Sequence, residues 1–157
     1  MTSSTARILP VAAVTLLAVA HWSPGGAGPL EDAVAAHRLG NFATAEQLLL
    51  PLAEQGDPVA QTILGQIYFL GEGTPKDSAK AASWFQMAAK QGYAKAELIL
   101  GRLYGRGEGV PLDYREAIHW YQLAAEQGDA TAQFNLGYIY EQGDMGASQD
   151  YAEAARW

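Results

Sequence analysis

The chain repeats one pattern with a period of 36 residues, and this period restricts its possible folds more than any other feature of the sequence. A fixed period of about 20–50 residues is typical of stacked repeat proteins, in which every unit packs mainly against its two neighbours. We therefore predict a stack of similar units. The recurring residues include Leu64 and Gly65, Leu100 and Gly101, Leu136 and Gly137, and the tyrosines Tyr68, Tyr104 and Tyr140.

Each unit has the sequence of two helices joined by a glycine-rich turn. From Leu30 onward, apolar residues recur at the three- and four-residue spacing of amphipathic helices. Asp77 and Asp113 can cap the second helix of their units, and Glu116 would complete a reciprocal capping box with Asp113. Asn41 can cap a helix of the first unit in the same way. The pattern predicts an all-α protein.

Glycine recurs in the middle of the first helix of each unit, at Gly65, Gly101 and Gly137. Inside a helix, glycine is less favourable than alanine by roughly 0.8–1.0 kcal/mol. Its recurrence therefore indicates that a neighbouring backbone comes too close for a side chain. Recurring aromatic residues are expected to fill the space between adjacent hairpins, and these are Tyr68, Tyr104, Tyr140, Trp84, Trp120 and Trp157.

The repeats, together with the different composition of the N-terminal residues, divide the chain into six segments. The first hairpin, with Leu30, Val34 and Ala35 on its apolar stripe, is atypical, as terminal units of repeat arrays usually are. The loop that ends at Asp150 is one residue longer than its counterpart in the preceding unit. The expected segments are an export signal at 1–20, a linker at 21–29, the hairpin at 30–56, full repeats at 57–92 and 93–128, and a partial third repeat at 129–157.

The first twenty residues have the layout of a secretory signal peptide. A polar segment with one positive charge, 1–7, precedes an apolar run, 8–20, which ends in the small-x-small pattern Ala18-Val19-Ala20. Spanning a bilayer needs about 20 apolar residues, which is more than this run contains. We therefore expect export, to the periplasm or the exterior, after cleavage. Retention of the signal as an anchor is the alternative, and membrane contact is expected only in that case.

Composition excludes several classes of function. The chain has 10 basic and 17 acidic residues, and the scattered basic residues argue against nucleic acid as a partner. The absence of cysteine removes disulfides, thiolate metal sites and cysteine nucleophiles. The histidines His21, His37 and His119 are isolated and form no pattern of metal ligands or of a catalytic triad. We predict a non-catalytic protein without a metal site or a cofactor.

The spaced motif Leu-Gly-x-x-Tyr, Gly-x-Gly-x-Pro-x-Asp and Ala-x-x-Trp-x-x-x-Ala-Ala-x-x-Gly resembles the Sel-one-like repeat family, a branch of the tetratricopeptide-like α-solenoids. The resemblance extends from about Leu30 to the last residue. It implies an all-α, right-handed superhelical solenoid of antiparallel helix pairs. It also implies an adaptor or scaffold that binds a protein or peptide partner and has no catalytic activity of its own.

The resemblance also indicates where a partner would bind, because the first helix of each pair lines the concave groove in tetratricopeptide-like repeats. Two arginines beside aromatic and amide side chains would suit an extended peptide, including one with an acidic group. The groove positions that follow from the repeat register are Gln66, Phe69, Leu70, Leu98, Arg102, Arg106, Phe134, Tyr138 and Gln142.

Two other functions stay open at this point. Some cysteine-rich secreted relatives are associated with β-lactam binding or hydrolysis, so one alternative is a cell-envelope enzyme or enzyme subunit acting on a wall or β-lactam-type ligand. The chain has neither cysteine nor a Ser-x-x-Lys motif, so this activity is not carried over. The second alternative is a truncated remnant of a longer repeat array, because the third unit stops at Trp157, short of the length of its predecessors.

Overall fold

The structure, a computed structural model, describes residues 28–157, and this part of the chain contains helices and no strands, which confirms the predicted all-α class. The predicted export signal at 1–20 and most of the predicted linker at 21–29 lie outside the described residues. Within 28–157, none of the helices combines the length and hydropathy needed to cross a membrane. The helices are α1 (Pro29–Arg38), α2 (Phe42–Glu54), α3 (Pro58–Leu70), α4 (Ser78–Ala89), α5 (Ala94–Arg106), α6 (Tyr114–Glu126), α7 (Ala130–Gln142) and α8 (Tyr151–Arg156).

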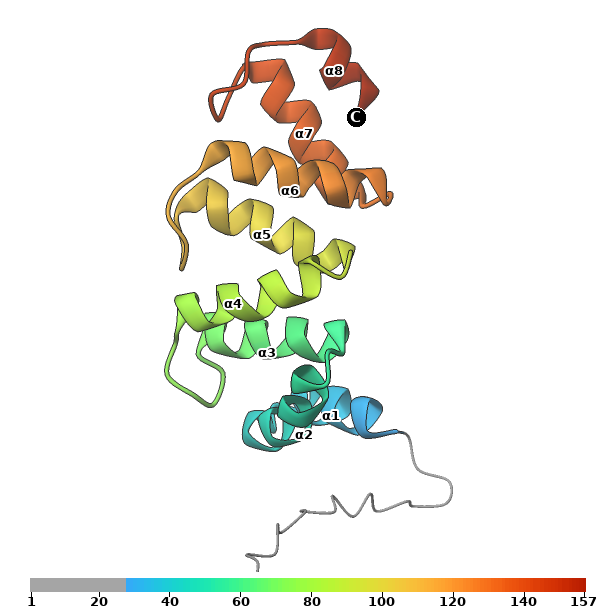
Figure 1. Ribbon diagram of the computed structural model, residues 1–157, viewed down its shortest axis with the longest axis vertical. Coiled ribbons are helices and arrows are strands. Elements are labelled where there is room, and N and C mark those ends of the chain that lie inside the picture. Colours follow the sequence, from blue (N-terminus) through green and yellow to red (C-terminus); the bar gives the residue numbers. More distant parts are fainter. Residues whose placement is uncertain (1–27) are drawn as a thin grey trace, which may run out of the picture.

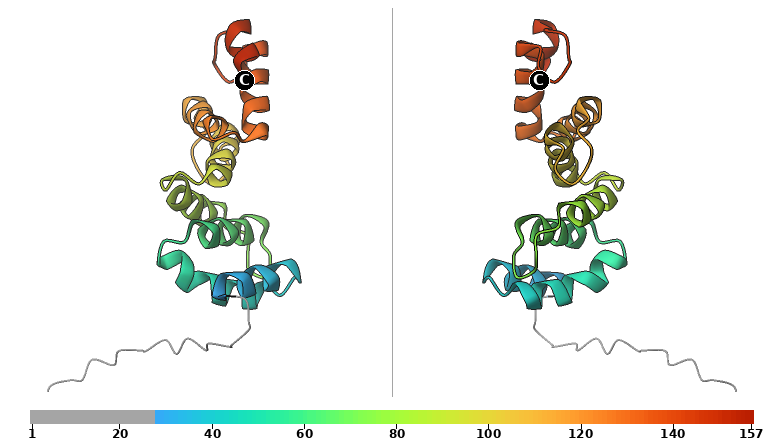
Figure 2. Two further views of the ribbon diagram at one scale, coloured as in Figure 1. Left: turned by 90° about the vertical axis from the view of Figure 1, so that its right-hand side faces the viewer. Right: turned by 90° about the vertical axis from the view of Figure 1, so that its left-hand side faces the viewer.

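These helices form an elongated stack in which consecutive helices pack against each other (Figure 1). The hairpin of α1 and α2 lies at one end and α8 at the other, and successive pairs are rotated relative to one another (Figure 2). The loops α3–α4, α5–α6 and α7–α8 gather along one edge (Figure 1). Each repeat therefore contributes one antiparallel helix pair, which confirms the predicted solenoid.

Aspartate side chains fix where several helices begin. Asp113 accepts hydrogen bonds from the backbone N–H groups of Arg115 (2.9 Å) and Glu116 (3.1 Å) and caps α6 as predicted. The reciprocal half of the capping box is absent, because the backbone N–H of Asp113 donates to the carbonyl oxygen of Tyr104 (3.0 Å), and the Glu116 carboxylate accepts a hydrogen bond from Trp120 Nε1. The predicted cap at Asn41 is also wrong: its backbone, at ψ 62°, is not extended, and its side chain makes no capping hydrogen bond.

The loop between α7 and α8 contains the extra residue found in the sequence. Gly107 ends α5 with a φ of 65°, a left-handed conformation that glycine adopts readily. In the longer loop after α7, Met145 adopts a φ of 53°, a conformation unfavourable for residues with a side chain. The Met145 side chain packs against the hydrophobic cluster of α6 and α7, and this packing holds the loop against the helices.

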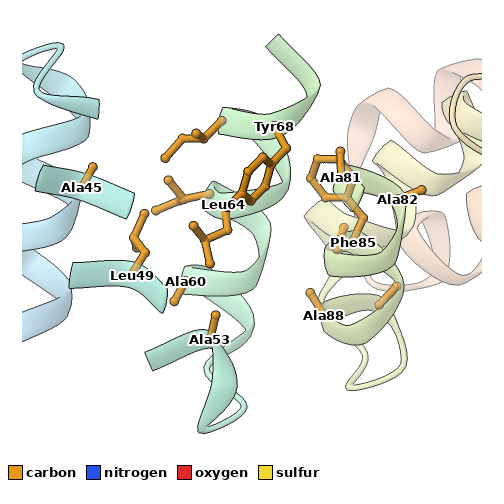
Figure 3. Close-up of a cluster of buried hydrophobic side chains, with 14 of the residues drawn as sticks. Ala45, Leu49, Ala53, Ala60, Leu64, Tyr68, Ala81, Ala82, Phe85 and Ala88 are labelled. Atoms are coloured by element: carbon orange, nitrogen blue, oxygen red, sulfur yellow. The ribbon is translucent and has the colours of Figure 1, made fainter. Parts of the chain in front are cut away.

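Alanine and larger apolar residues alternate where the helices meet. Figure 3 shows Leu64 and Tyr68 of α3 between Leu49 of α2 on one side and Phe85 of α4 on the other. All four side chains are buried. Small alanines at the other contact positions allow the helices to approach closely, which leaves room for these larger side chains. The core is therefore continuous from the first hairpin into the second repeat.

The first hairpin packs through a different face of α1 than the sequence pattern indicated. Ala33 and Ala36 are buried, whereas Leu30 and Val34 are partly buried and Ala35 is exposed. The predicted stripe is therefore wrong at Ala35. The buried face of α1 is set by its neighbour, because α1 packs mainly against α2. The smallest side chains lie where the two helices approach most closely.

Gly65 and Gly101 lie where the first helix of a pair meets an aromatic ring on the second. A Cβ atom added to Gly65 would lie 2.6 Å from the Phe85 ring, and one added to Gly101 would lie 2.6 Å from the Tyr121 ring. The predicted close approach at these two glycines is confirmed, but the close neighbour is a ring and not a backbone. Each ring occupies the space that a side chain would otherwise fill.

Candidate functional site

An apolar hollow opens between α3 and α5, with a volume of about 180 Å³. Its sides are α3 and α5, the first helices of the first and second repeats. Helix α4 and the loop after α5 contribute one residue each. We call this site the apolar hollow. It is lined by Gln66, Phe69, Leu70, Phe85, Ile99, Arg102, Leu103, Arg106 and Glu108.

A second, more polar hollow adjoins it between α5 and α7, with a volume of about 430 Å³. We call this site the polar hollow. The two hollows share Arg102 and Arg106, so these side chains form the boundary between them. The remaining lining residues of the polar hollow are Gly105, Tyr114, Tyr121, Thr131, Asn135, Asp144 and Met145.

Arg102 and Arg106 carry positive charges that form no salt bridge with a carboxylate of residues 28–157. They lie four residues apart on α5, which places them on one face of the helix, and both are exposed. Neither takes part in the salt bridges found among residues 28–157. Burial raises the pKa of Tyr121, and the charges of these two arginines oppose that shift. Both arginines are therefore close enough to the polar hollow to influence its tyrosine.

The arginines belong to the second repeat alone. The same two positions carry other side chains in the first and third repeats, although the first helices of those repeats, α3 and α7, have the same length as α5. The first helix therefore does not require arginine at either position. In repeat order, the first position is Gln66, Arg102 and Tyr138, and the second is Leu70, Arg106 and Gln142.

The structure gathers five of the nine predicted groove residues in the apolar hollow. Three come from α3 and two from α5. Residues 36 positions apart meet here because the equivalent helices of adjacent repeats stack side by side. The five are Gln66, Phe69, Leu70, Arg102 and Arg106.

The other four predicted residues lie elsewhere. Leu98 is partly buried and packs against the hydrophobic cluster of α6 and α7. Phe134 and Tyr138 line a separate hollow of about 480 Å³ between α7 and α8. Gln142 is exposed at the end of α7 and lines none of these three hollows. The nine predicted groove residues are therefore distributed over the apolar hollow, the hollow between α7 and α8, a hydrophobic cluster and an exposed helix end.

Sequence reasoning missed four residues of the apolar hollow, namely Phe85, Ile99, Leu103 and Glu108. Phe85 and Leu103 are buried, and their helical periodicity assigns them to the core. The signal that could have identified Phe85 is Gly65, whose missing side chain makes room for the ring. Glu108 lies in a loop, and helical register does not determine the position of a loop residue.

Glu97 on α5 is only 2% exposed, which is unusual for a carboxylate. Its Oε2 atom accepts a hydrogen bond of 2.7 Å from Gln127 Nε2. Burial raises the pKa of Glu97, while the hydrogen bond from Gln127 and the charge of His119 act in the opposite direction. In residues 28–157, the side chains of His, Cys, Asp and Glu form no group of three or more that could hold a metal ion.

A family model described as Sel1 repeat matches three consecutive segments of the chain, 58–93, 94–129 and 130–157. No curated protein matches the chain at a significant level. The matched segments follow the helix pairs α3–α4, α5–α6 and α7–α8. Phe69, Leu70 and the two arginines of the apolar hollow therefore lie in the first two matched segments.

Solved structures give the same result. A Sel1 repeat protein from Oxalobacter formigenes is 34% identical, with a TM-score of 0.77, over 82% of this chain and 52% of that chain. The protein c5321, a protective antigen present in uropathogenic Escherichia coli strains and displaying an SLR fold, is 37% identical, with a TM-score of 0.76, over 82% of this chain and 28% of that chain. This chain thus spans about half of the first relative and less than a third of the second.

A more distant structure, Helicobacter pylori cysteine rich protein B, is 23% identical, with a TM-score of 0.56, over 65% of this chain and 87% of that chain. At this identity the comparison shows the fold alone. It agrees with the helix-pair solenoid described above.

Proposed function

This protein belongs to the Sel1 repeat family, and we propose that it is an exported, non-catalytic interaction module that binds a protein or peptide partner in the apolar hollow between α3 and α5. Proteins built from this repeat generally act as scaffolds for protein–protein interaction. The observation that carries the proposal for this chain is the hollow itself, because it combines an accessible apolar lining with two arginines that form no salt bridge among residues 28–157.

The hollow has the chemistry of a binding site. Leu70 is 61% exposed beside Phe69, so burial of this pair by a partner would remove apolar surface from water. Arg102 and Arg106 can each donate several hydrogen bonds to a partner's oxygen atoms. An apolar centre with polar groups at its edge is the arrangement that protein interfaces use.

The export part of the proposal rests on the sequence of residues 1–20, whose charged, apolar and small-residue segments follow the order of a signal peptide. It is tested by expressing the full chain with a C-terminal tag and determining the N-terminus of the accumulated protein by mass spectrometry. We expect an N-terminus at His21, with the protein in the periplasm or the medium. An intact Met1 in the cytoplasmic fraction would contradict export.

Site-specific photo-crosslinking tests the binding part. A photoreactive phenylalanine analogue is placed at position 70 of the full chain in living cells, and crosslinked proteins are identified by mass spectrometry. The matched control is the same analogue at Met87, an exposed apolar residue of α4 that lies outside the apolar hollow. We expect a discrete crosslinked partner from position 70 and none from position 87. Equal crosslinking from both positions, or none from position 70, would contradict the proposal.

A further inference from the structure

We infer that the partner segment bound in this hollow is an extended peptide carrying one acidic side chain within about two residues of a bulky apolar side chain. The inference rests on the proposed function and specifies its ligand. It combines two features of the same surface, the shape and lining of the apolar hollow and the charge at its boundary. Neither feature alone would define the ligand.

The apolar half of the ligand follows from the lining of the hollow. Phe69, Leu70, Ile99 and Leu103 supply its apolar surface, and Phe85 is the buried ring behind Gly65. A volume of about 180 Å³ matches a single large side chain better than a whole helix. We therefore assign the hollow to one aliphatic or aromatic side chain of the partner.

The acidic half follows from the arginines. Within residues 28–157, Arg102 and Arg106 form no salt bridge, and the net charge of the chain is −7, so the two arginines place positive charge at one site on an acidic molecule. A guanidinium group binds a carboxylate through two parallel hydrogen bonds, and this pairing is stronger than a bond between neutral groups. Such a site attracts an acidic group and disfavours a basic one.

The comparison between repeats gives independent support. The first helices of the first and third repeats, α3 and α7, form and stack with other side chains at the positions of the arginines. These side chains are Gln66 and Leu70 in α3, and Tyr138 and Gln142 in α7. Stacking therefore does not need the two charges.

The surroundings of the arginines restrict the ligand further. Glu108 lies in the apolar hollow and Asp144 in the polar hollow, so a carboxylate stands on either side of the arginine pair. A run of several acidic residues would meet one of these carboxylates and be repelled. A single acidic side chain avoids both. Since an extended chain advances ~3.3 Å per residue, and the arginines themselves line the apolar hollow, this side chain must lie close to the apolar one.

The remainder of the peptide would cross the polar hollow. Thr131 and Asn135 of α7 supply hydroxyl and amide groups there, and Tyr114 adds an exposed ring. Hydroxyl and amide groups can pair with the amide groups of an extended backbone, which nucleic acids lack. The overall negative charge of the chain also argues against a nucleic acid in this position.

The test is a selection from a display library of random linear peptides on the purified full-length protein, followed by fluorescence-anisotropy titration of the enriched peptides. We expect enriched sequences with Asp or Glu within two residues of a large apolar residue. Their affinity should fall at least about 10-fold for R102E/R106E, because a hydrogen bond to a charged group is worth about one decade in Kd. The variant R102K/R106K should retain part of the affinity, because it keeps the charge but loses the planar fork.

The matched control is R38E/R115E, which makes the same change in net charge at two exposed arginines of α1 and α6 that line neither hollow. It should bind the peptides as the unaltered protein does, and circular dichroism should show that both double variants keep their helices. Equal losses in the two double variants would overturn the inference, because they would show a general effect of charge. A library that yields no binder would overturn it as well.

One outcome separates the inference from the proposed function. Enriched peptides without an acidic residue, bound equally by R102E/R106E but competing with the partner crosslinked at Leu70, would overturn the inference and leave the apolar hollow as the binding site. Failure of the crosslinking experiment would contradict the proposed function itself.

Discussion

The hairpins α3–α4 and α7–α8 carry glycine at the same repeat position, but the two glycines have different neighbours. A Cβ atom on Gly65 would lie 2.6 Å from the Phe85 ring, whereas one on Gly137 would meet the carbonyl oxygen of Ala154 at 3.5 Å. The first distance requires the neighbour to move, and the second is an ordinary contact. The same sequence motif therefore makes room for a ring in one hairpin and not in the other.

The repeats also differ at the position four residues before these glycines. Gln61 Nε2 donates a hydrogen bond to the carbonyl oxygen of Ala53 (2.9 Å), and Gln133 Nε2 donates one to that of Ala125 (3.1 Å). The second repeat has Glu97 here, and an ionised carboxylate has no proton to donate. Equivalent positions thus differ in what they contribute, and substitutions at matched positions can measure the difference.

The largest expected effect comes from removing the ring. Phe85 is 1% exposed, so Phe85→Ala should lower the free energy of unfolding by about 3–5 kcal/mol. A control change outside the repeat register, Phe134→Ala on α7, removes the same atoms from a side chain that is 72% exposed. It should change the free energy of unfolding by less than about 0.5 kcal/mol. Chemical denaturation of both variants measures the two values. Equal losses would contradict the difference between the two hairpins.

Alanine at the two glycines gives the next largest contrast. Gly65→Ala places a methyl group against the Phe85 ring, and such overpacking costs about 1–3 kcal/mol, only partly offset by the better helix propensity of alanine. Gly137→Ala meets no such obstacle and should be neutral or stabilising by up to about 1 kcal/mol. In a double-mutant cycle, Phe85→Leu should reduce the cost of Gly65→Ala. Additive effects would show that the ring is not the obstacle.

The contrast at Glu97 depends on pH. Burial raises the pKa of Glu97 in the folded state, so its protonated form is favoured by folding, and the resulting stability is present at low pH and lost as pH rises through the folded-state pKa. Glu97→Gln supplies a permanent donor and should stabilise the protein by about 1–2 kcal/mol at neutral pH. The gain should shrink below the ordinary glutamate pKa of about 4.3.

The reverse substitution provides the control. Gln61→Glu places a carboxylate at the matched position of the first repeat, where Gln61 also accepts a hydrogen bond from Gln91 Nε2. It should destabilise the protein increasingly as pH rises. Unfolding experiments across the acidic range measure both variants. A Glu97→Gln gain that stays constant with pH would contradict the role assigned to the carboxylate.

The smallest effect concerns helix caps, which the repeats also use unequally. Asp57 caps α3 by accepting hydrogen bonds from the backbone N–H groups of Val59 and Ala60, whereas Tyr93 at the start of α5 makes no side-chain cap. Asp57→Ala should cost about 1 kcal/mol, while Asp57→Asn should cost much less because asparagine is also a good cap. Thermal unfolding of the two variants separates them. A loss that is the same in both would point to the charge and not to the cap.

The sequence was sufficient for the fold, because a 36-residue period with helical spacing determines which helices are equivalent and which are neighbours. The sequence was less reliable where tertiary contacts determine which hydrogen bond a capping residue makes or which face of a helix is buried. Asn41 and Glu116 are good capping residues by type, but neither makes the predicted bond. The backbone of Asn41 is not extended, and the backbone N–H of Asp113 donates to Tyr104 instead of Glu116. Ala35 fits the apolar stripe of α1 but faces solvent, because α1 packs mainly on one neighbour.

In the candidate site, too, the repeat register predicted some residues, and tertiary packing determined the others. Register alone brings Gln66 and Leu70 together with Arg102 and Arg106, because equivalent helices stack. Register wrongly assigns Leu98 to the same hollow, because the Leu98 side chain packs against the hydrophobic cluster of α6 and α7. It also misses Phe85, a second-helix residue that reaches the hollow only because Gly65 has no side chain. Side-chain size across a helix pair decided these cases.

Charge reversal tests the binding account most directly. The peptide most enriched in the selection, and its variant with the acidic residue replaced by lysine, are titrated against the unaltered protein and R102E/R106E. We predict that the acidic peptide binds only the unaltered protein well, and that the lysine peptide binds R102E/R106E more tightly than it binds the unaltered protein. If the acidic peptide binds both proteins equally, the arginine pair does not recognise the ligand and the account is contradicted.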